Sequence, residues 1–150
     1  MIIAAQAVLV LMAAAAPTCK TADARVEDAI AGKSRELNGQ EYCQFRIYET
    51  LSDLDGDGID DFVVVFTVEG AGGGGNNSTQ YLLVLASRSG WQPVEARVGA
   101  RGERTVESVE VSKGTLRLHV LKYGRGDAMC CPSRPASVRY RLAGRTLTEE

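Results

Sequence analysis

The chain has 150 residues, of which 17 are basic and 19 are acidic, so its formal net charge is −2. This length allows one domain with a single core and is too short for two. Because the charges are nearly balanced and form no basic stripe, we expect no nucleic acid partner.

The first sixteen residues, MIIAAQAVLVLMAAAA, form an uncharged apolar run that ends in small residues. This pattern is typical of a signal peptide, and the run is too short to span a bilayer comfortably. We therefore expect residues 1–16 to be removed and residues 17–150 to form one β-rich domain without a transmembrane segment. A lipid anchor at Cys19 is the less favoured alternative, because Pro17 and Thr18 stand where lipidation signals usually carry small residues.

Residues 21–37 predict a short amphipathic helix. The apolar residues near one side of its helical wheel are Val26, Ala29, Ile30 and Leu37. We expect Gly32 to interrupt this segment, and the apolar stripe is thin. The helix is therefore expected to pack on another element rather than to stand alone.

After Gln40 the hydrophobic pattern changes from helical to alternating. The candidate strands are residues 43–50, 61–68, 80–87, 91–98, 104–112, 115–123 and 136–142. Turn-rich segments separate them, and residues 87–90 and 113–114 indicate hairpins. The expected fold class is mainly β: an antiparallel meander sheet of about seven strands with one short N-terminal helix.

Two of these strands carry patterns that place them in the sheet. The segment FVVVFTV, residues 62–68, is apolar on both faces, which predicts a central strand. Residues 138–142 alternate apolar residues with Arg139 and Arg141, which predicts one buried face, one solvated face and a position nearer an edge.

Residues 53–61, DLDGDGIDD, contain five aspartates and two glycines. Alternating carboxylates on a tightly coiled loop converge on one point, where their repulsion opposes that conformation unless a cation is bound. Gly56 and Gly58 permit the curl, and Asp60 is expected to be a bystander. The expected ligands are the carboxylates of Asp53, Asp55, Asp57 and Asp61 and the backbone carbonyl of Ile59. Hard oxygen ligands in this number favour a structural Ca²⁺ ion.

The same residues bear on two alternatives to this site. An EF-hand is excluded because its twelfth position would be Val64, where a bidentate acid is required. A solvated acidic turn without a bound ion is the alternative explanation of clustered Asp and Gly. The sequence offers no catalytic residues: it has no nucleophile–base pair, and its one histidine, His119, lies in an alternating strand.

Four cysteines, Cys19, Cys43, Cys130 and Cys131, remain in the mature chain, so an oxidising compartment allows three pairings. Adjacent cysteines have Cα atoms about 3.8 Å apart, below the usual disulfide range, so a Cys130–Cys131 bond would be readily reduced. Alternatively, the adjacent pair points to opposite faces and bonds separately to Cys19 and Cys43. A soft-metal thiolate pair would lack companion ligands. From the residues alone, the connectivity stays open.

The segment DLDGDGIDDFVVVF, residues 53–66, resembles the calcium loop of FG-GAP and VCBS-type repeats, in which an Asp-rich loop leads into a hydrophobic strand. Because one copy is present, a whole propeller is excluded. Over residues 43–149 the chain is also similar to small exported bacterial proteins of unknown function that combine such a loop with a Gly-rich turn and a late MCCPS segment. This resemblance implies their fold, a periplasmic or secreted location, a Cys130–Cys131 bond and a Cys19–Cys43 bond. It implies no activity.

Three functions are compatible with these observations. The favoured one is a non-enzymatic exported protein, stabilised by Ca²⁺ and disulfides, that binds another protein or an envelope component. The alternative is a redox protein that uses Cys130 and Cys131. A hydrolase or inhibitor ranks last, since no nucleophile–base pair supports it.

Overall fold

The computed structural model describes residues 19, 23–46, 48–112 and 114–150. These residues form one helix, α1 (Ala24–Glu36), nine strands and three short 3₁₀ segments, η1 (Cys43–Phe45), η2 (Ala71–Gly73) and η3 (Ser87–Ser89). The strands are β1 (Gln40–Glu41), β2 (Tyr48–Ser52), β3 (Asp61–Glu69), β4 (Ser78–Leu85), β5 (Pro93–Ala100), β6 (Arg104–Ser112), β7 (Thr115–Lys122), β8 (Arg134–Ala143) and β9 (Thr146–Glu149). The predicted signal peptide, residues 1–16, lies outside the described residues.

All strands belong to one sheet in the order β1-β3-β4-β5-β6-β7-β8-β9, and β2 also pairs with β3. Every pairing is antiparallel, and from β3 onward each strand pairs with the next in the chain. The prediction of a mainly β antiparallel meander with one N-terminal helix is therefore confirmed. Instead of one strand over residues 43–50, the chain forms η1 and then β2, and the short strands β1 and β9 were not predicted.

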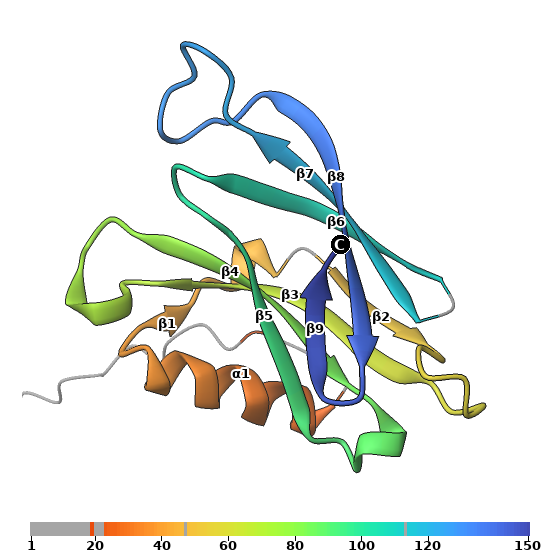
Figure 1. The fold of residues 1–150 in the computed structure, drawn as a ribbon. Helices are drawn as coiled ribbons and strands as arrows, with labels where there is room; N and C mark the ends of the chain where they lie inside the picture. Colours follow the sequence, from red (N-terminus) through yellow and green to blue (C-terminus); the bar gives the residue numbers. More distant parts are fainter. Residues whose placement is uncertain (1–18, 20–22, 47, 113) are drawn as a thin grey trace, which may run out of the picture.

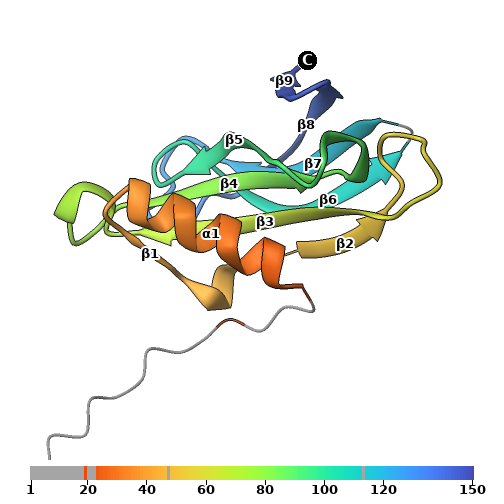
Figure 2. The ribbon, with the colours of Figure 1, turned by 90° about the horizontal axis from the view of Figure 1, so that it is seen from below.

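The sheet folds over on itself between β5 and β6, which pair only at Ala100 and Arg104. Register shifts at Gln80/Tyr81 and at Val106/Ser108 accompany this bend. The main core lies between the two parts of the sheet, with Val63, Val65, Leu82 and Val84 on one side and Val109, Leu116, Leu118 and Val138 on the other. In Figure 2, α1 lies on the opposite side of β3 and β4 from β8 and β9.

A second core lies between α1 and the outer face of β3 and β4. Val26 and Ile30 of the helix are fully buried there, against residues that include Phe62, Val64, Phe66 and Leu83. Both faces of β3 are thus covered, which confirms its predicted central position. The expectation that Gly32 interrupts the helix is wrong, because α1 continues through it. A glycine in a helix interior costs only about 1 kcal/mol, which packing on the sheet offsets.

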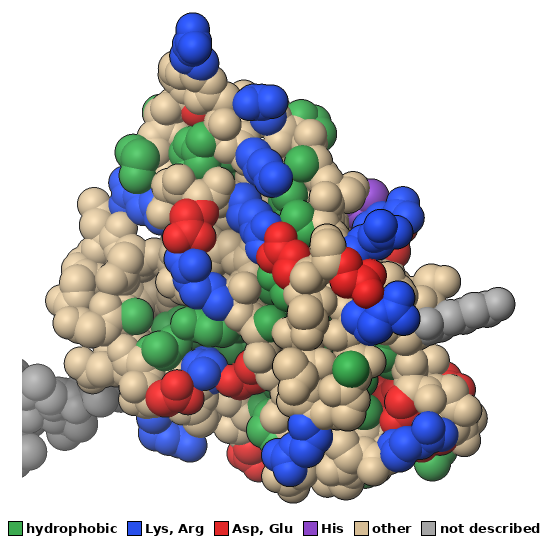
Figure 3. Space-filling model, in the orientation of Figure 1, with side chains coloured by type: hydrophobic (Ala, Val, Ile, Leu, Met, Phe, Trp, Pro, Cys, Tyr) green, Lys and Arg blue, Asp and Glu red, His purple; other side chains and the backbone are tan. Residues whose placement is uncertain are grey.

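On the face shown in Figure 3, basic and acidic side chains are interspersed rather than gathered by sign. Val138 and Tyr140 of β8 are buried, whereas Arg139 and Arg141 are exposed, as the alternation predicted. None of the helices in the described part of the chain is long and apolar enough to cross a membrane.

Candidate metal centre

The aspartate-rich loop connects β2 to β3, the central strand of the sheet. Gly56 and Gly58 have φ angles of +77° and +86°, which L side chains rarely adopt. The loop coils around Asp53, whose Oδ1 accepts hydrogen bonds from the amides of Gly56 and Asp57, at 2.7 and 3.0 Å. Its Oδ2 accepts from the Gly58 amide at 3.0 Å. The expected curl is therefore present, and the two glycines form it as the sequence predicted.

Asp61 connects the loop to the core of the protein. It is fully buried at the first position of β3. Its Oδ2 accepts from the amides of Leu54 and Asp55, at 2.8 and 3.2 Å. Its Oδ1 accepts from the amide of Ser87, at 2.9 Å. Because backbone amides donate hydrogen bonds to both of its oxygens, the buried carboxylate of Asp61 is satisfied and held in place.

Three of the predicted carboxylate ligands meet in the structure. Asp53, Asp55 and Asp61 each offer an oxygen, and these oxygens lie within 4.8 Å of one another. Calcium binds oxygens at about 2.3–2.6 Å, so two ligands on opposite sides of one ion are about 5 Å apart. The spacing of the three oxygens therefore fits a shared Ca²⁺ ion, and their chemistry matches the hard ligands that this ion prefers.

The other two predicted ligands are placed differently. Asp57 is directed at Ser87, whose hydroxyl donates to Asp57 Oδ2. This bond, together with the amide of Ile59, which donates to Asp57 Oδ1 at 2.9 Å, lowers the pKa of Asp57 below its usual value. The side chain of Ile59 is exposed, and the ligand expected from this residue is its backbone carbonyl. Asp60 is also exposed.

The contribution of η3 is not among the features predicted from the sequence. Besides the two contacts of Ser87, the amide of Arg88 donates to Asp55 Oδ2 at 3.3 Å. A signal for this was available, because in an antiparallel β3–β4 hairpin the residues that follow β4 must lie beside the start of β3. The register pairs Phe62 with Leu85, which brings Ser87 next to Asp61. An open cleft of about 830 Å³ adjoins the loop, with Arg88 and Arg145 among its lining residues.

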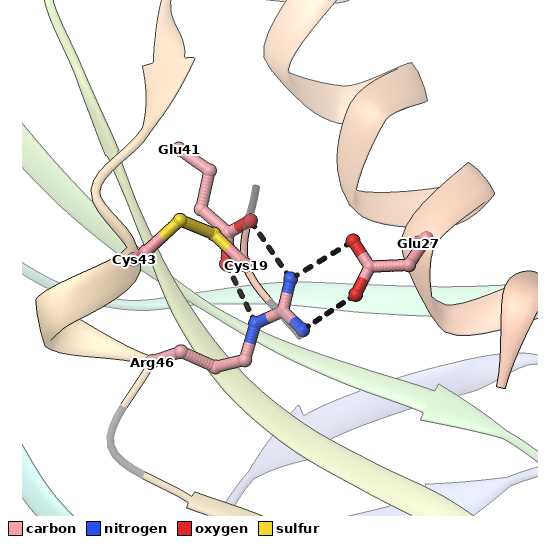
Figure 4. The surroundings of a disulfide bond; sticks show 5 residues. All are labelled: Cys19, Glu27, Glu41, Cys43 and Arg46. Atoms are coloured by element: carbon pink, nitrogen blue, oxygen red, sulfur yellow. Dashed lines mark hydrogen bonds and ion pairs between the residues drawn. A yellow bond between two sulfur atoms is a disulfide. The ribbon is translucent and has the colours of Figure 1, made fainter. Parts of the chain in front are cut away.

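Cys19 and Cys43 are joined by a disulfide, with their Cα atoms 5.2 Å apart. Figure 4 shows Arg46 beside this bond. Arg46 Nε lies 2.7 Å from Glu41 Oε1, and Arg46 Nη1 lies 2.8 Å from Glu27 Oε1. Burial alone would lower the pKa of Arg46, but the hydrogen bonds that its guanidinium donates to Glu41 and Glu27 outweigh it and raise the pKa. Disulfide and ion pairs together connect α1, β1 and η1.

Cys130 and Cys131 are bonded to each other, and both are exposed. They lie in the connection between β7 and β8, which Asp127 organises. Its Oδ2 accepts hydrogen bonds from the amides of Gly124 and Ser133, at 2.7 and 2.9 Å. These bonds, first among them the one from Gly124, lower the pKa of Asp127. The connection is therefore held by the Asp127 side chain, which binds backbone amides within the same connection.

No catalytic arrangement is found around His119 in the part of the chain that the structure describes. Its Nε2 lies 3.1 Å from Glu110 Oε1, on the face of β7 opposite the buried Leu116, Leu118 and Val120. This is the structural position that the alternation predicted.

No family model, curated protein or solved structure matches the chain. The resemblance of residues 53–66 to FG-GAP and VCBS-type calcium loops therefore stays a prediction.

Proposed function

We propose that this is an exported, non-enzymatic binding module whose sheet is stabilised by one structural Ca²⁺ ion. The observation that carries the proposal is the convergence of the Asp53, Asp55 and Asp61 carboxylates within 4.8 Å. Three like charges at this distance repel one another unless a cation neutralises them. Asp57 and the Ile59 carbonyl complete the proposed ligand set.

A structural role follows from where the loop is attached. Asp61 is part of β3, and Ser87 joins the loop to the end of β4. An ion at this point would stabilise the start of the central strand together with its neighbour. The proposed partner is a protein or an envelope component, reached by export through the signal sequence in residues 1–16.

The experiment is urea unfolding of the full chain with excess Ca²⁺ and with chelator. At about 100 times its dissociation constant, Ca²⁺ should raise the free energy of unfolding by about 2.7 kcal/mol. Asp55→Asn should abolish most of this increase, because it removes a ligand charge. Asp60→Asn is the matched control, since it makes the same charge change in the same loop at a non-ligand position. Equal unfolding curves with and without Ca²⁺ would end the proposal.

A redox function is the second candidate, favoured by the exposure of both bonded cysteines, Cys130 and Cys131. In this reaction an external protein dithiol would give two electrons and two protons to the bond. The products would be two thiols on this chain and a disulfide in the donor. After brief treatment of the folded protein with a dithiol and then with iodoacetamide, mass spectrometry should find alkylation at Cys130 and Cys131, with Cys19 and Cys43 still bonded. A Cys130–Cys131 bond that stays intact would exclude this function.

A further inference from the structure

A groove of about 440 Å³ lies between η1, the β5–β6 turn and the β7–β8 connection. It shares no lining residue with the cleft beside the aspartate loop. Its volume is within the range of small-molecule sites, which are concave, mostly apolar and few per protein. The groove is therefore a second candidate site, separate from the metal centre.

One wall of the groove is apolar and open to solvent. Four large hydrophobic residues of the described chain are exposed, and two of them, Phe45 and Met129, line this groove, 49% and 57% exposed. The Cys130–Cys131 disulfide and Pro132 continue the wall beside Met129. Apolar surface concentrated in one concavity is typical of a binding site, whereas isolated exposed apolar residues are ordinary.

The groove is held in shape by hydrogen bonds between its walls. The hydroxyl of Tyr123 donates to the carbonyl of Met129 at 2.6 Å and accepts from the amide of Gly102 at 3.2 Å. This single side chain joins the β5–β6 turn to the β7–β8 connection. At the base, the buried Gln80 side chain bonds both the amide and the carbonyl of Val106, at 2.7 and 3.3 Å. A site ordered before binding loses less conformational entropy when a ligand arrives.

The charged residues that line the groove are all basic. None of its described lining residues is acidic, and two are basic, Arg101 and Arg104. Arg104 is neutralised by Glu149, at 2.7 Å. Arg101 donates to the backbone carbonyl of Asn76 at 2.7 Å, which places its guanidinium at the border between this groove and a second hollow lined by Glu69 and Asn76. Among the described residues Arg101 forms no ion pair. An uncompensated guanidinium beside an apolar wall favours a ligand that combines a carboxylate with an apolar body.

We propose that this groove binds an amphipathic organic carboxylate, with its apolar chain against Phe45, Met129 and the Cys130–Cys131 disulfide and its carboxylate at Arg101. This site goes beyond the proposed metal function and does not depend on it. Decanoate is the probe, and decyltrimethylammonium is the matched comparison because it has the same chain and the opposite charge.

Calorimetric titration of the full chain without added Ca²⁺, which would precipitate decanoate, and below the concentration of micelle formation tests the proposal. Decanoate should bind saturably and at least about tenfold more tightly than decyltrimethylammonium. Arg101→Gln should remove this preference, whereas Arg125→Gln, a control at an exposed arginine outside the groove, should keep it. Equal affinity for the two probes, or equal effects of the two variants, would overturn the charge assignment.

The contribution of the apolar wall is tested with a second variant and its control. Met129→Ser should weaken decanoate binding about tenfold or more, whereas Leu51→Ser, at a residue with the same 57% exposure outside the groove, should leave it unchanged. On the unaltered protein, decanoate should shift the NMR resonance of the Met129 methyl group, assigned with Met129→Leu. A methyl resonance that does not move would reject the site, whatever the outcome of the Ca²⁺ experiment.

Discussion

Arg46 is a buried cation with two carboxylate partners: 7% of its side chain is exposed, against 11% for Glu41. Replacing it by Met would leave Glu41 charged, poorly solvated and without its guanidinium. Loss of one partner of a buried pair is costly because the other charge stays buried. We expect Arg46→Met to lower the free energy of unfolding by about 3 kcal/mol, measured by urea denaturation.

The control for this substitution is Arg97→Met, which removes an ion pair with Glu103 in which both side chains are about half exposed. Water screens such pairs, so this change should cost no more than about 1 kcal/mol. Equal losses in the two variants would show that burial of Arg46 is not what gives its pairs their importance.

Glu149 should make the free energy of unfolding depend on pH. Its hydrogen bond with Arg104, opposed by burial and aided by the hydroxyl of Tyr140, lowers its pKa from 4.5 to about 2. A lowered pKa in the folded state stabilises the fold above pH 4.5, and this contribution is lost as the pH falls toward 2. Because the side chain is 42% exposed, screening reduces the effect to about 1 kcal/mol.

Glu149→Gln should therefore be less stable than the unaltered protein at pH 6, and the difference should shrink between pH 4.5 and pH 2. Chemical denaturation at a series of pH values measures it. Two stability profiles that stay parallel down to pH 2 would contradict this assignment.

At the scale of elements, two glycines of neighbouring segments should respond oppositely to the same substitution. A Cβ at Gly39, between α1 and β1, would lie 2.6 Å from the carbonyl oxygen of Glu69 and 2.8 Å from Val68 Cγ1. A Cβ at Gly32, inside α1, would meet nothing within 4 Å. Gly39→Ala should cost about 2 kcal/mol through overpacking, and Gly32→Ala should gain about 0.5–1 kcal/mol through helix propensity.

Thermal and urea unfolding of the two variants check this prediction, and each serves as the control for the other. Destabilisation by Gly32→Ala would show that the backbone of α1 needs a glycine there. An unchanged stability in Gly39→Ala would mean that β1 is free to move away from β3.

The elements that the sequence predicted best are those with strong period-2 patterns. Residues 104–112 coincide with β6, and the doubly apolar segment 62–68 is the buried central strand β3. The pattern failed where packing with distant residues decides the structure. β1 has two residues and depends on its pairing with Glu69 and Val68, so no local periodicity reveals it. β9, by contrast, pairs with β8 across a local turn at Gly144, and its four residues, TLTE, are too few and too polar to show a clear period-2 pattern.

The candidate metal site, too, was predicted where its pattern is local and missed where it depends on distant residues. Spacing alone predicted that Asp53, Asp55 and Asp61 converge, because the ligand pattern is local to one loop. The contacts from Ser87 and Arg88 come from residues 26 to 33 positions away, so only the strand pairing reveals them. The groove at Phe45 and Met129 could not be predicted, since its walls come from five separate segments that no sequence motif connects.

At the scale of the molecule, side chains and covalent bonds connect parts that the sheet ladder does not. β9 lies beside β5 (Figure 1), and Arg104 bridges them, because its Nε donates to the carbonyl of Val98 at 2.6 Å and its Nη2 pairs with Glu149. At the other end of the chain, the Cys19–Cys43 bond joins the residues before α1 to η1. Ion pairing and hydrogen bonding by Arg104 thus hold β5 and β9 together, whereas a disulfide holds the segment before α1 to η1.

The two disulfides should therefore differ in what they contribute to stability. Cys19 and Cys43 are 24 residues apart in sequence, so their bond restricts the unfolded chain, which corresponds to about 3 kcal/mol. Cys130 and Cys131 are adjacent, and their bond closes almost no loop. Replacing Cys19 and Cys43 by Ser should lower the free energy of unfolding by about that amount, and replacing Cys130 and Cys131 by Ser should change it little. Equal losses, or a non-reduced peptide that links Cys43 to Cys130 or Cys131, would contradict this division.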